Sequence, residues 1–197
     1  SVETNGRRRW SSLYKTEKNS VIESVQFNTD HIAVNVFWGP SVITKILDYN
    51  GRQRFEISTP ECCTMSQISF TKDLDIANVL LSSHFKQRIP ARYSIKEKRF
   101  LDPTIEKQMM SYDGVDFTSS IHWAKSEDGT RIPTRLTYRK DLPKNGQNGL
   151  LIYGYGGFNS AGYMRSFNSK MDAFSIKNGG IIAGPALRGG NEYGPKW

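Results

Sequence analysis

The segment with the strongest chemical character is LLIYGYGGFNS at residues 150–160. A run of apolar residues leads there into a turn that contains Tyr155, Gly156, Gly157 and Phe158. Glycines let a backbone come close to a reacting oxygen, and their N–H groups, with a tyrosine hydroxyl, can stabilise a developing negative charge. The spacing alone also fits a tight turn whose aromatic residues pack into a core, so both interpretations stay open at this point.

Other glycine-dependent motifs are excluded by single positions. The dinucleotide fingerprint Gly-x-Gly-x-x-Gly would need a third glycine where Asn159 stands, and a phosphate-binding loop would need a Gly-Lys-Ser/Thr ending. The nucleophile elbow Gly-x-Ser-x-Gly does not occur in the sequence. Ser160 is a near match, followed by Ala161 and Gly162, but Phe158 occupies the place of the first glycine.

Histidines and cysteines give no second reactive site. His31, His84 and His122 lie inside or beside predicted strands and turns, which favours structural roles, and no Cys or carboxylate recurs at the spacing of metal ligands. Cys62 and Cys63 are adjacent, an arrangement that ordinary disulfide geometry disfavours. We therefore predict reduced thiols, no metal and no cofactor.

Composition limits the class of protein and its partners. The 197 residues are 37% hydrophobic and 23% charged, which is typical of a soluble globular protein. No apolar run approaches the roughly 18 residues of a membrane span, and no secretory signal is visible. The formal net charge is +8, but apart from Arg7, Arg8 and Arg9 the cations are interspersed with acidic residues. This dispersal favours a solvated surface over a nucleic-acid or membrane partner.

The sequence before residues 113–118 has an all-β rhythm of short apolar runs separated by turns. In the run at 31–38, alternate residues predict one buried face, and Asn50-Gly51 predicts a type I′ hairpin turn between two strands. The remaining predicted strands cover residues 41–48, 53–57, 67–70, 77–82, 91–95 and 98–101. Together they indicate two four-stranded meanders within a larger sandwich or propeller.

The later part of the sequence begins with a predicted hairpin whose turn is Asp128-Gly129. Alternate residues Ile132, Leu136 and Tyr138 predict its buried face. Residues 150–153 then form a continuous apolar run, which predicts a strand in the middle of a sheet covered on both sides.

A helix and a strand follow that apolar run. Residues 167–178 predict a helix with Phe167, Met171 and Phe174 on its buried face and Asn178-Gly179 as its C-cap. Residues 180–184 predict a buried strand. Strand, helix and strand in this order predict a right-handed parallel crossover in an α/β sheet. Ligands bind such sheets where loops leave the carboxyl ends of the strands, which is where the glycine-rich turn falls.

Three motifs in register resemble the prolyl oligopeptidase family of serine peptidases: SEDGTRIP at 126–133, YGYGGF at 153–158 and ALRGGNEYGPKW at 186–197. The resemblance implies that residues 116–197 are the start of an α/β-hydrolase peptidase domain, the N-terminal part of its catalytic sheet. It implies that residues 1–115 are a β-rich segment, the last blades of a β-propeller. Both parts are expected to be incomplete in this chain.

The resemblance also implies roles for individual residues. Tyr155 matches the tyrosine whose hydroxyl stabilises the oxyanion, and Phe158 matches an aromatic residue of the pocket for the proline side chain. The two glycines between them would bring the loop beside the scissile carbonyl. Arg188 and Glu192, in the next loop, would shape the approach of the substrate.

The implied activity of the parent protein is that of a serine endopeptidase that cleaves short proline-containing peptides after proline. The family's Ser, Asp and His lie beyond the last motif, so none of the triad is present in this sequence. Because the sequence has no initiator Met and stops at Trp197 after a glycine-rich segment, we expect a fragment. Without the triad it should be inactive, and the apolar edges of its incomplete sheets should leave it marginally folded. The parent is expected to be monomeric and cytoplasmic, with a periplasmic location as the alternative.

Two alternatives remain from the sequence. One is a noncatalytic β-propeller or β-rich interaction module with an α/β appendage. The other is a related α/β-hydrolase, an esterase or an acylaminoacyl peptidase, which would share the architecture but not the pair Tyr155 and Phe158.

Overall fold

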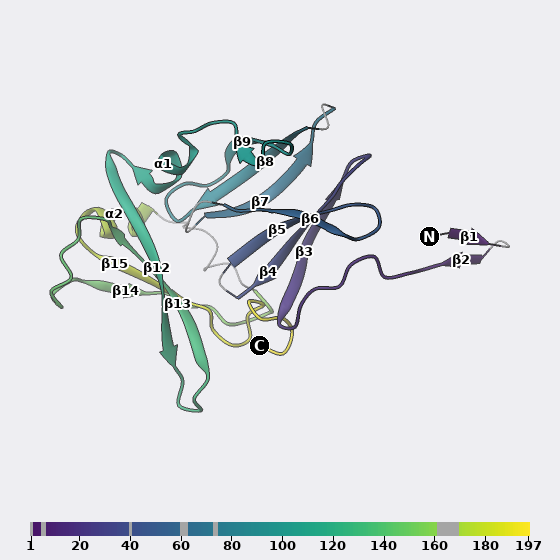
Figure 1. Ribbon diagram of the computed structural model, residues 1–197. Coiled ribbons are helices and arrows are strands. Elements are labelled where there is room, and N and C mark those ends of the chain that lie inside the picture. Colours follow the sequence, from purple (N-terminus) through teal and green to yellow (C-terminus); the bar gives the residue numbers. More distant parts are fainter. Residues whose placement is uncertain (1, 5–6, 40, 60–62, 73–74, 161–169) are drawn as a thin grey trace.

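The computed structural model describes residues 2–4, 7–39, 41–59, 63–72, 75–160 and 170–197. A short antiparallel hairpin, β1 (Val2–Thr4) and β2 (Arg7–Arg9), lies apart from the other elements at the N-terminal end (Figure 1). The other strands form three sheets. Within the described ranges, no helix has both the length and the apolar character that crossing a membrane requires.

The first sheet is a four-stranded antiparallel meander with its strands in sequence order, as predicted, although its first strand was not among the predicted strands. Its strands are β3 (Ser20–Phe27), β4 (Ile32–Trp38), β5 (Ser41–Leu47) and β6 (Gln53–Ile57). Strand β4 is buried on both faces rather than one. Ala33 joins the core between the two meanders, while Val34 and Val36 cluster with Leu47 and Tyr14 on the opposite face.

The predicted type I′ turn between β5 and β6 is wrong. A type I′ turn needs positive φ at both central residues, but here only Gly51 has one, at +78°. The carboxylate of Asp48 accepts hydrogen bonds from the N–H groups of Asn50 and Arg52, each at 2.9 Å. These bonds hold a wider turn with a shifted register, because an aspartate can cap nearby backbone donors.

The second sheet is also a four-stranded antiparallel meander, which confirms the second such prediction. Its strands are β7 (Cys63–Phe70), β8 (Ile76–Ser83), β9 (Ile89–Ser94) and β10 (Arg99–Phe100). A shared apolar core joins the two meanders: Ile46 and Ile57 of the first pack with Met65 and Leu81 of the second. Met109, from the short helix α1 (Ile105–Met110), completes this core.

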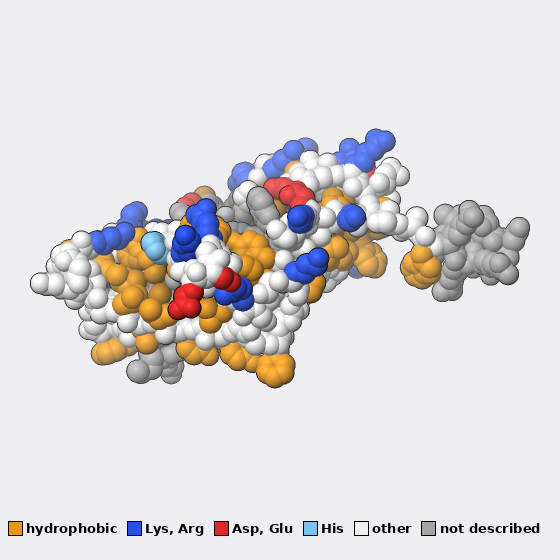
Figure 2. Space-filling model, turned by 90° about the horizontal axis from the view of Figure 1, so that it is seen from below, with side chains coloured by type: hydrophobic (Ala, Val, Ile, Leu, Met, Phe, Trp, Pro, Cys, Tyr) orange, Lys and Arg blue, Asp and Glu red, His pale blue; other side chains and the backbone are white. Residues whose placement is uncertain are grey.

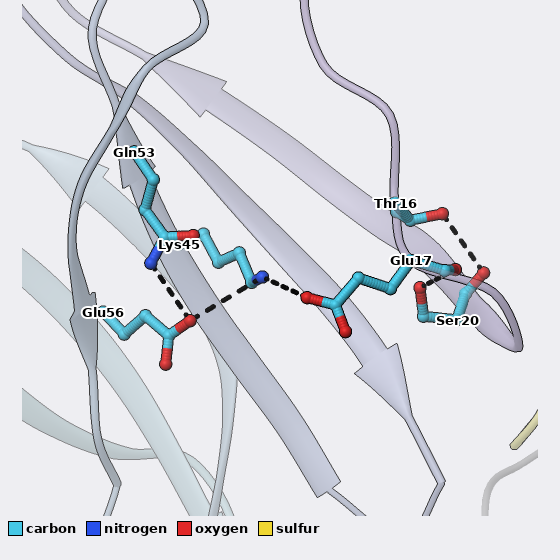
Figure 3. A network of polar contacts seen from close by, with 6 residues as sticks. All are labelled: Thr16, Glu17, Ser20, Lys45, Gln53 and Glu56. Atoms are coloured by element: carbon cyan, nitrogen blue, oxygen red, sulfur yellow. Dashed lines mark hydrogen bonds and ion pairs between the residues drawn. The ribbon is translucent and has the colours of Figure 1, made fainter.

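A salt-bridge network attaches the segment before β3 to the outside of the first sheet (Figure 3). The Lys45 side chain is only 13% exposed, and its ammonium lies 3.4 Å from a Glu17 carboxylate oxygen and 3.7 Å from one of Glu56. The hydroxyl of Ser20 donates to the main-chain oxygen of Glu17 at 2.6 Å. Burial alone would lower the pKa of Lys45, but the neighbouring acidic groups outweigh it and raise that pKa.

The third sheet is mixed, with the strand order β11-β12-β13-β15-β14. Its members are β11 (Ser111–Tyr112), β12 (Val115–Lys125), β13 (Arg131–Arg139), β14 (Leu150–Ile152) and β15 (Ile181–Pro185). The hairpin of β12 and β13 forms with its turn at Asp128-Gly129, as predicted, and extends well beyond the other strands (Figure 1). Ile132 and Tyr138 are buried, whereas Leu136 is half-buried.

Strands β14 and β15 pair in parallel, with helix α2 (Lys170–Lys177) between them in sequence. This confirms the predicted strand, helix and parallel strand. The burial predicted for the first of these strands is wrong: β14 is at the edge of its sheet, and Leu150, Leu151 and Ile152 are all exposed. An apolar run indicates that a strand is suited to burial, but burial also requires other elements to cover the strand. None of the described elements covers β14 on its outer side.

Helix α2 ends as predicted, but a different face of it is buried. Gly179 has a φ of +85°, and the Gly180 N–H donates to the main-chain oxygen of Ser175 at 2.8 Å, which is a glycine C-cap. Phe174, predicted to be buried, is 65% exposed, and Ile176 is fully buried instead. Phe167 and the side chain of Met171 lie outside what the structure describes.

A second apolar cluster joins the mixed sheet to the loop between β8 and β9 of the second meander. The rings of Phe85 and Phe117 stack with their centroids 4.2 Å apart, and Ile176 and Ile182 pack against them. The β12–β13 hairpin, helix α2 and strand β15 are thereby fixed to the meanders through one contact region.

Charged side chains on the face shown in Figure 2 are spread rather than gathered. Lys and Arg residues lie at the left, in the centre and along the top of that face, with a few Asp and Glu near the centre and apolar side chains along the lower edge. This distribution is consistent with the solvated surface charge that the sequence predicts.

Candidate functional site

The glycine-rich loop leaves the carboxyl end of β14 and lies against the loop that leaves β15. The Tyr153 N–H donates to the Ala183 main-chain oxygen at 3.0 Å and so extends the parallel pairing by one residue. A Cβ atom added at Gly154 would lie 2.8 Å from a methyl carbon of Leu187, and one added at Gly156 would lie 2.5 Å from the Arg188 main-chain oxygen. Side chains at these two positions would therefore push the loops apart.

The second loop needs glycine for the same reason. Gly189 has a φ of +92°, and an added Cβ would lie only 1.9 Å from the Gly156 main-chain oxygen. The Asn159 N–H donates to the Gly189 main-chain oxygen at 3.0 Å. Two motifs that the sequence places more than thirty residues apart are thus in backbone contact, which periodicity alone does not predict.

Tyr155 stands on this glycine-rich loop with 49% of its surface exposed. Its hydroxyl lies over Gly157, where an added Cβ would approach the oxygen to 3.0 Å. The ring is therefore not packed into the core, which was the alternative left open by the sequence. Its hydroxyl lies beside the loop that contains Gly156 and Gly157.

Phe158 is at the tip of the same loop and is 97% exposed. Both Phe158 and Asn159 have positive φ, at +53° and +56°, a conformation that is uncommon for residues other than glycine. The structure places Phe158 on the loop with Tyr155, but no described residue encloses its ring. Its role in a substrate pocket stays a prediction. Ser160, the near match to a nucleophile, has its N–H bonded to the Gly157 main-chain oxygen at 3.1 Å.

Arg188 links the loop after β15 to the turn of the β12–β13 hairpin. Its guanidinium forms an ion pair with Asp128 and donates to the Ser126 hydroxyl at 3.2 Å. The pKa of Asp128 is lowered to about 2, first because the Thr130 N–H donates to its carboxylate and then because Arg188 does. The structure thus brings all three sequence motifs into one contact region.

Glu192 is buried, unlike a residue on the surface of a substrate channel. A Cβ added at Gly190 would lie 2.3 Å from a Glu192 carboxylate oxygen, so the side chain folds back against its own loop. The Glu192 main-chain oxygen accepts a hydrogen bond from the Gly39 N–H at 2.9 Å. These contacts connect the loop after β15 with the first meander.

His31 and His84 occupy structural positions, whereas His122 is exposed on β12. His84 is buried, and its Nδ1 lies 2.5 Å from the Thr137 hydroxyl oxygen, which in turn lies 2.7 Å from that of Ser119. The His31 ring stacks on Phe70 with centroids 6.3 Å apart. Across the described ranges, no group of three His, Cys, Asp or Glu side chains could hold a metal ion. Cys63 is buried, and Cys62 lies outside the described residues.

Sequence reasoning missed an aromatic and basic pocket near the end of the chain. It is lined by Asn19, Trp123, Arg131, Tyr193, Lys196 and Trp197. These residues come from three separate parts of the chain, so no local pattern could have identified them.

Comparison with known proteins gives one consistent result. The chain is similar to a prolyl endopeptidase from Elizabethkingia meningoseptica, with 39% identity over 92 residues, which are 47% of this chain and 13% of that protein. It is also similar to prolyl oligopeptidase A from Amanita bisporigera, with 39% identity over 82 residues, or 42% of this chain and 11% of that protein. No protein-family model matches the chain.

Solved structures with a similar fold are also prolyl oligopeptidases. Prolyl oligopeptidase B from Galerina marginata superposes with a TM-score of 0.70 over 93% of this chain and 26% of that one, at 23% identity. The chain therefore spans about a quarter of that structure and 13% of the first bacterial relative. The relatives in sequence and the neighbours in fold are thus prolyl endopeptidases and prolyl oligopeptidases, and this chain spans a part of their length.

Proposed function

We propose that the chain is part of a serine-type peptidase that cleaves short peptides after proline. The relatives that support this are named prolyl endopeptidase and prolyl oligopeptidase, and the chain covers only a small share of their length. The observation that carries the proposal is the position of Tyr155: a half-exposed phenol on a loop whose glycines lie in backbone contact with the loop after β15.

In the proposed reaction, a serine hydroxyl from another part of the protein gives its proton to a histidine base, and its oxygen adds to the carbonyl carbon of the scissile peptide bond. The carbonyl oxygen then becomes negatively charged, and the Tyr155 hydroxyl donates a hydrogen bond to it. Such donors are most effective when they are already in position before the charge develops. The glycine contacts at Gly156 and Gly189 would provide this positioning by fixing the loop on the sheet.

The remaining residues have supporting roles in this proposal. Phe158 would become part of the wall around the proline ring once a further part of the protein covers it. Arg188 would hold the glycine loops on the β12–β13 hairpin through Asp128. Glu192 would shape the same loop from beneath, so we assign it a positioning role rather than direct contact with the peptide.

We further propose that residues 1–115 are the last blades of a β-propeller and residues 116–197 the start of an α/β-hydrolase domain. The two antiparallel meanders support the first part, and the parallel pair β14 and β15 with helix α2 supports the second. The exposed edge strand β14 would then pair with a further strand of the catalytic sheet. A monomeric, cytoplasmic parent protein is part of the same proposal.

By itself, the chain is proposed to be inactive, because its sequence contains no Gly-x-Ser-x-Gly elbow and therefore no activated serine. The test is to read the gene downstream of the Trp197 codon, express the complete product and assay peptides with and without proline before the scissile bond. A nucleophile elbow followed by Asp and His, with cleavage after proline, is the expected result. A complete product that lacks the elbow, or that does not cleave such peptides, would refute the proposal.

A further inference from the structure

The pocket that the sequence did not predict lies between the first meander, the β12–β13 hairpin and the end of the chain. Its volume is about 320 Å³, which is the size of a site for a small ligand. None of the residues 154–158 lines it, so it is distinct from the site proposed for peptide cleavage.

The walls of the pocket are aromatic rings held by their own contacts. The rings of Tyr193 and Trp197 meet edge to face, with centroids 4.8 Å apart. The Trp197 indole N–H donates to the Ala186 main-chain oxygen at 3.2 Å, and the Tyr193 ring lies on Gly39, where an added Cβ would approach its hydroxyl oxygen to 3.0 Å. These contacts fix the rings before any ligand binds, which lowers the entropic cost of binding.

The charged side chains that line the pocket are both cations. Arg131 and Lys196 both line it, and none of the lining side chains is a carboxylate. The Arg131 guanidinium lies 4.6 Å from the centre of the Trp123 ring, a cation–π contact that restrains its plane. A guanidinium fixed in this way can still direct its N–H groups to a carboxylate, whose two oxygens match its planar geometry.

From this arrangement we propose that the pocket binds the C-terminal carboxylate of a short peptide whose last residue carries an apolar ring. The two cations would hold the carboxylate, and the rings of Trp123, Tyr193 and Trp197 would pack against the ring of the peptide. The amide of Asn19, which also lines the pocket, is suited to a hydrogen bond with the peptide main chain. The binding requires no bond to form or break.

The test is calorimetric titration of the chain with three probes: acetyl-Gly-Phe with a free carboxylate, the same peptide as its C-terminal amide, and inorganic phosphate. The free acid is expected to bind at least about tenfold more tightly than the amide, because a lost charge-assisted hydrogen bond weakens binding by this order. It should also bind more tightly than phosphate, which has the charge but no ring. Equal binding of acid and amide would overturn the proposal, as would phosphate binding as tightly as the acid.

The matched variants are Arg131→Gln in the pocket and Arg99→Gln outside it, where Arg99 forms a surface ion pair with Glu97. Arg131→Gln should weaken binding of the free acid at least about tenfold, and Arg99→Gln should leave it unchanged. Trp123→Leu should reduce the difference in affinity between the acid and phosphate. Thermal melts of each variant separate a loss of folding from a loss of binding.

An Arg131→Gln variant that melts like the wild type and still binds the acid with full affinity would refute the site. Peptide cleavage is not measured in these titrations, so the result is independent of the proposed function.

Discussion

The guanidinium of Arg188 forms an ion pair with the carboxylate of Asp128, which lies 60 residues earlier in the chain. The pair connects the loop after β15 with the turn of the β12–β13 hairpin. Because the same loop is in backbone contact with Gly156, this ion pair also restrains the surroundings of Tyr155. The contacts among the three loops therefore define the geometry on which the proposed function depends.

The first prediction concerns the titration of Asp128. Its pKa is about 2, so its contribution to stability is fully present above the ordinary value near 3.8 and is lost as the pH falls through 2. We expect Arg188→Gln to raise the pKa of Asp128 without restoring its ordinary value, because the Thr130 N–H still donates to the carboxylate. NMR titration of the Asp128 carboxyl carbon in both proteins measures this. An unchanged pKa in the variant would contradict the ion pair.

The second prediction concerns the contact between Gly156 and Gly189. In Gly189→Ala the added methyl would meet the Gly156 main-chain oxygen at 1.9 Å, in a backbone with positive φ. Backbone strain alone should lower the free energy of unfolding by about 1–3 kcal/mol, and separation of the loops should lower it further. Gly146→Ala is the control, since Gly146 has a φ of +82° but open space around it. Chemical denaturation that gives equal losses for the two variants would show that the loops are not in contact.

The third prediction tests the buried face of helix α2. Ile176→Ala should lower the free energy of unfolding by about 2–5 kcal/mol, because Ile176 is fully buried against Phe85, Phe117 and Ile182. Phe174→Ala, on the same helix, should change it by less than about 0.5 kcal/mol, because Phe174 is mostly exposed. Urea denaturation compares the two. A larger loss of stability in Phe174→Ala than in Ile176→Ala would show that the buried face of the helix is the one predicted from the sequence.

The fourth prediction concerns the segment before β3. Lys45→Met removes the cation between Glu17 and Glu56 and should make residues 10–19 exchange their amide protons faster. Since the pKa of Lys45 is raised, its contribution is present below its ordinary value of 10.5 and is lost as the pH rises through the higher folded value. The coupling free energy of Lys45 and Glu17 in a double-mutant cycle should be below about 1 kcal/mol, because Glu17 is largely exposed.

Hydrogen exchange of wild type, Lys45→Met and Lys18→Met measures the effect on the segment. Lys18 is the matched control, an exposed cation next to Glu17 in sequence. If Lys18→Met accelerates exchange as much as Lys45→Met does, the network does not hold the segment on the sheet.

Much of the fold could be predicted from the sequence because its signals are local. Alternating apolar residues and turn residues identified both meanders, and Asp128-Gly129 identified the turn of the long hairpin. The Asn50-Gly51 turn was predicted in the wrong form, because the Asp48 carboxylate caps the backbone there and selects a wider turn. A local propensity is overruled when a nearby side chain offers the backbone a better set of hydrogen bonds.

Two features could not be predicted from the sequence: which residues of helix α2 are buried, and which loops meet at the candidate site. Both depend on contacts between residues that are far apart in the sequence. The spacing of Phe174 with the apolar residues before it fits a buried helix face, but the packing of α2 on the mixed sheet buries Ile176 instead. The motifs placed Tyr155 and Gly156 on a loop at a strand end. The contact of that loop with Gly189, and the pairing of Arg188 with Asp128, arise only when the chain folds.

The most direct test of the account is the effect of Tyr155→Phe on the complete gene product, with a peptide that carries proline before the scissile bond. If the Tyr155 hydroxyl stabilises the oxyanion, kcat should fall by about 10²–10³, because this is the usual effect of removing one such donor, while KM changes little. The control is Tyr153→Phe, a neighbouring half-exposed tyrosine to which the account assigns no catalytic role. A Tyr155→Phe enzyme with the kcat of the wild type would show that the Tyr155 hydroxyl does not stabilise the oxyanion.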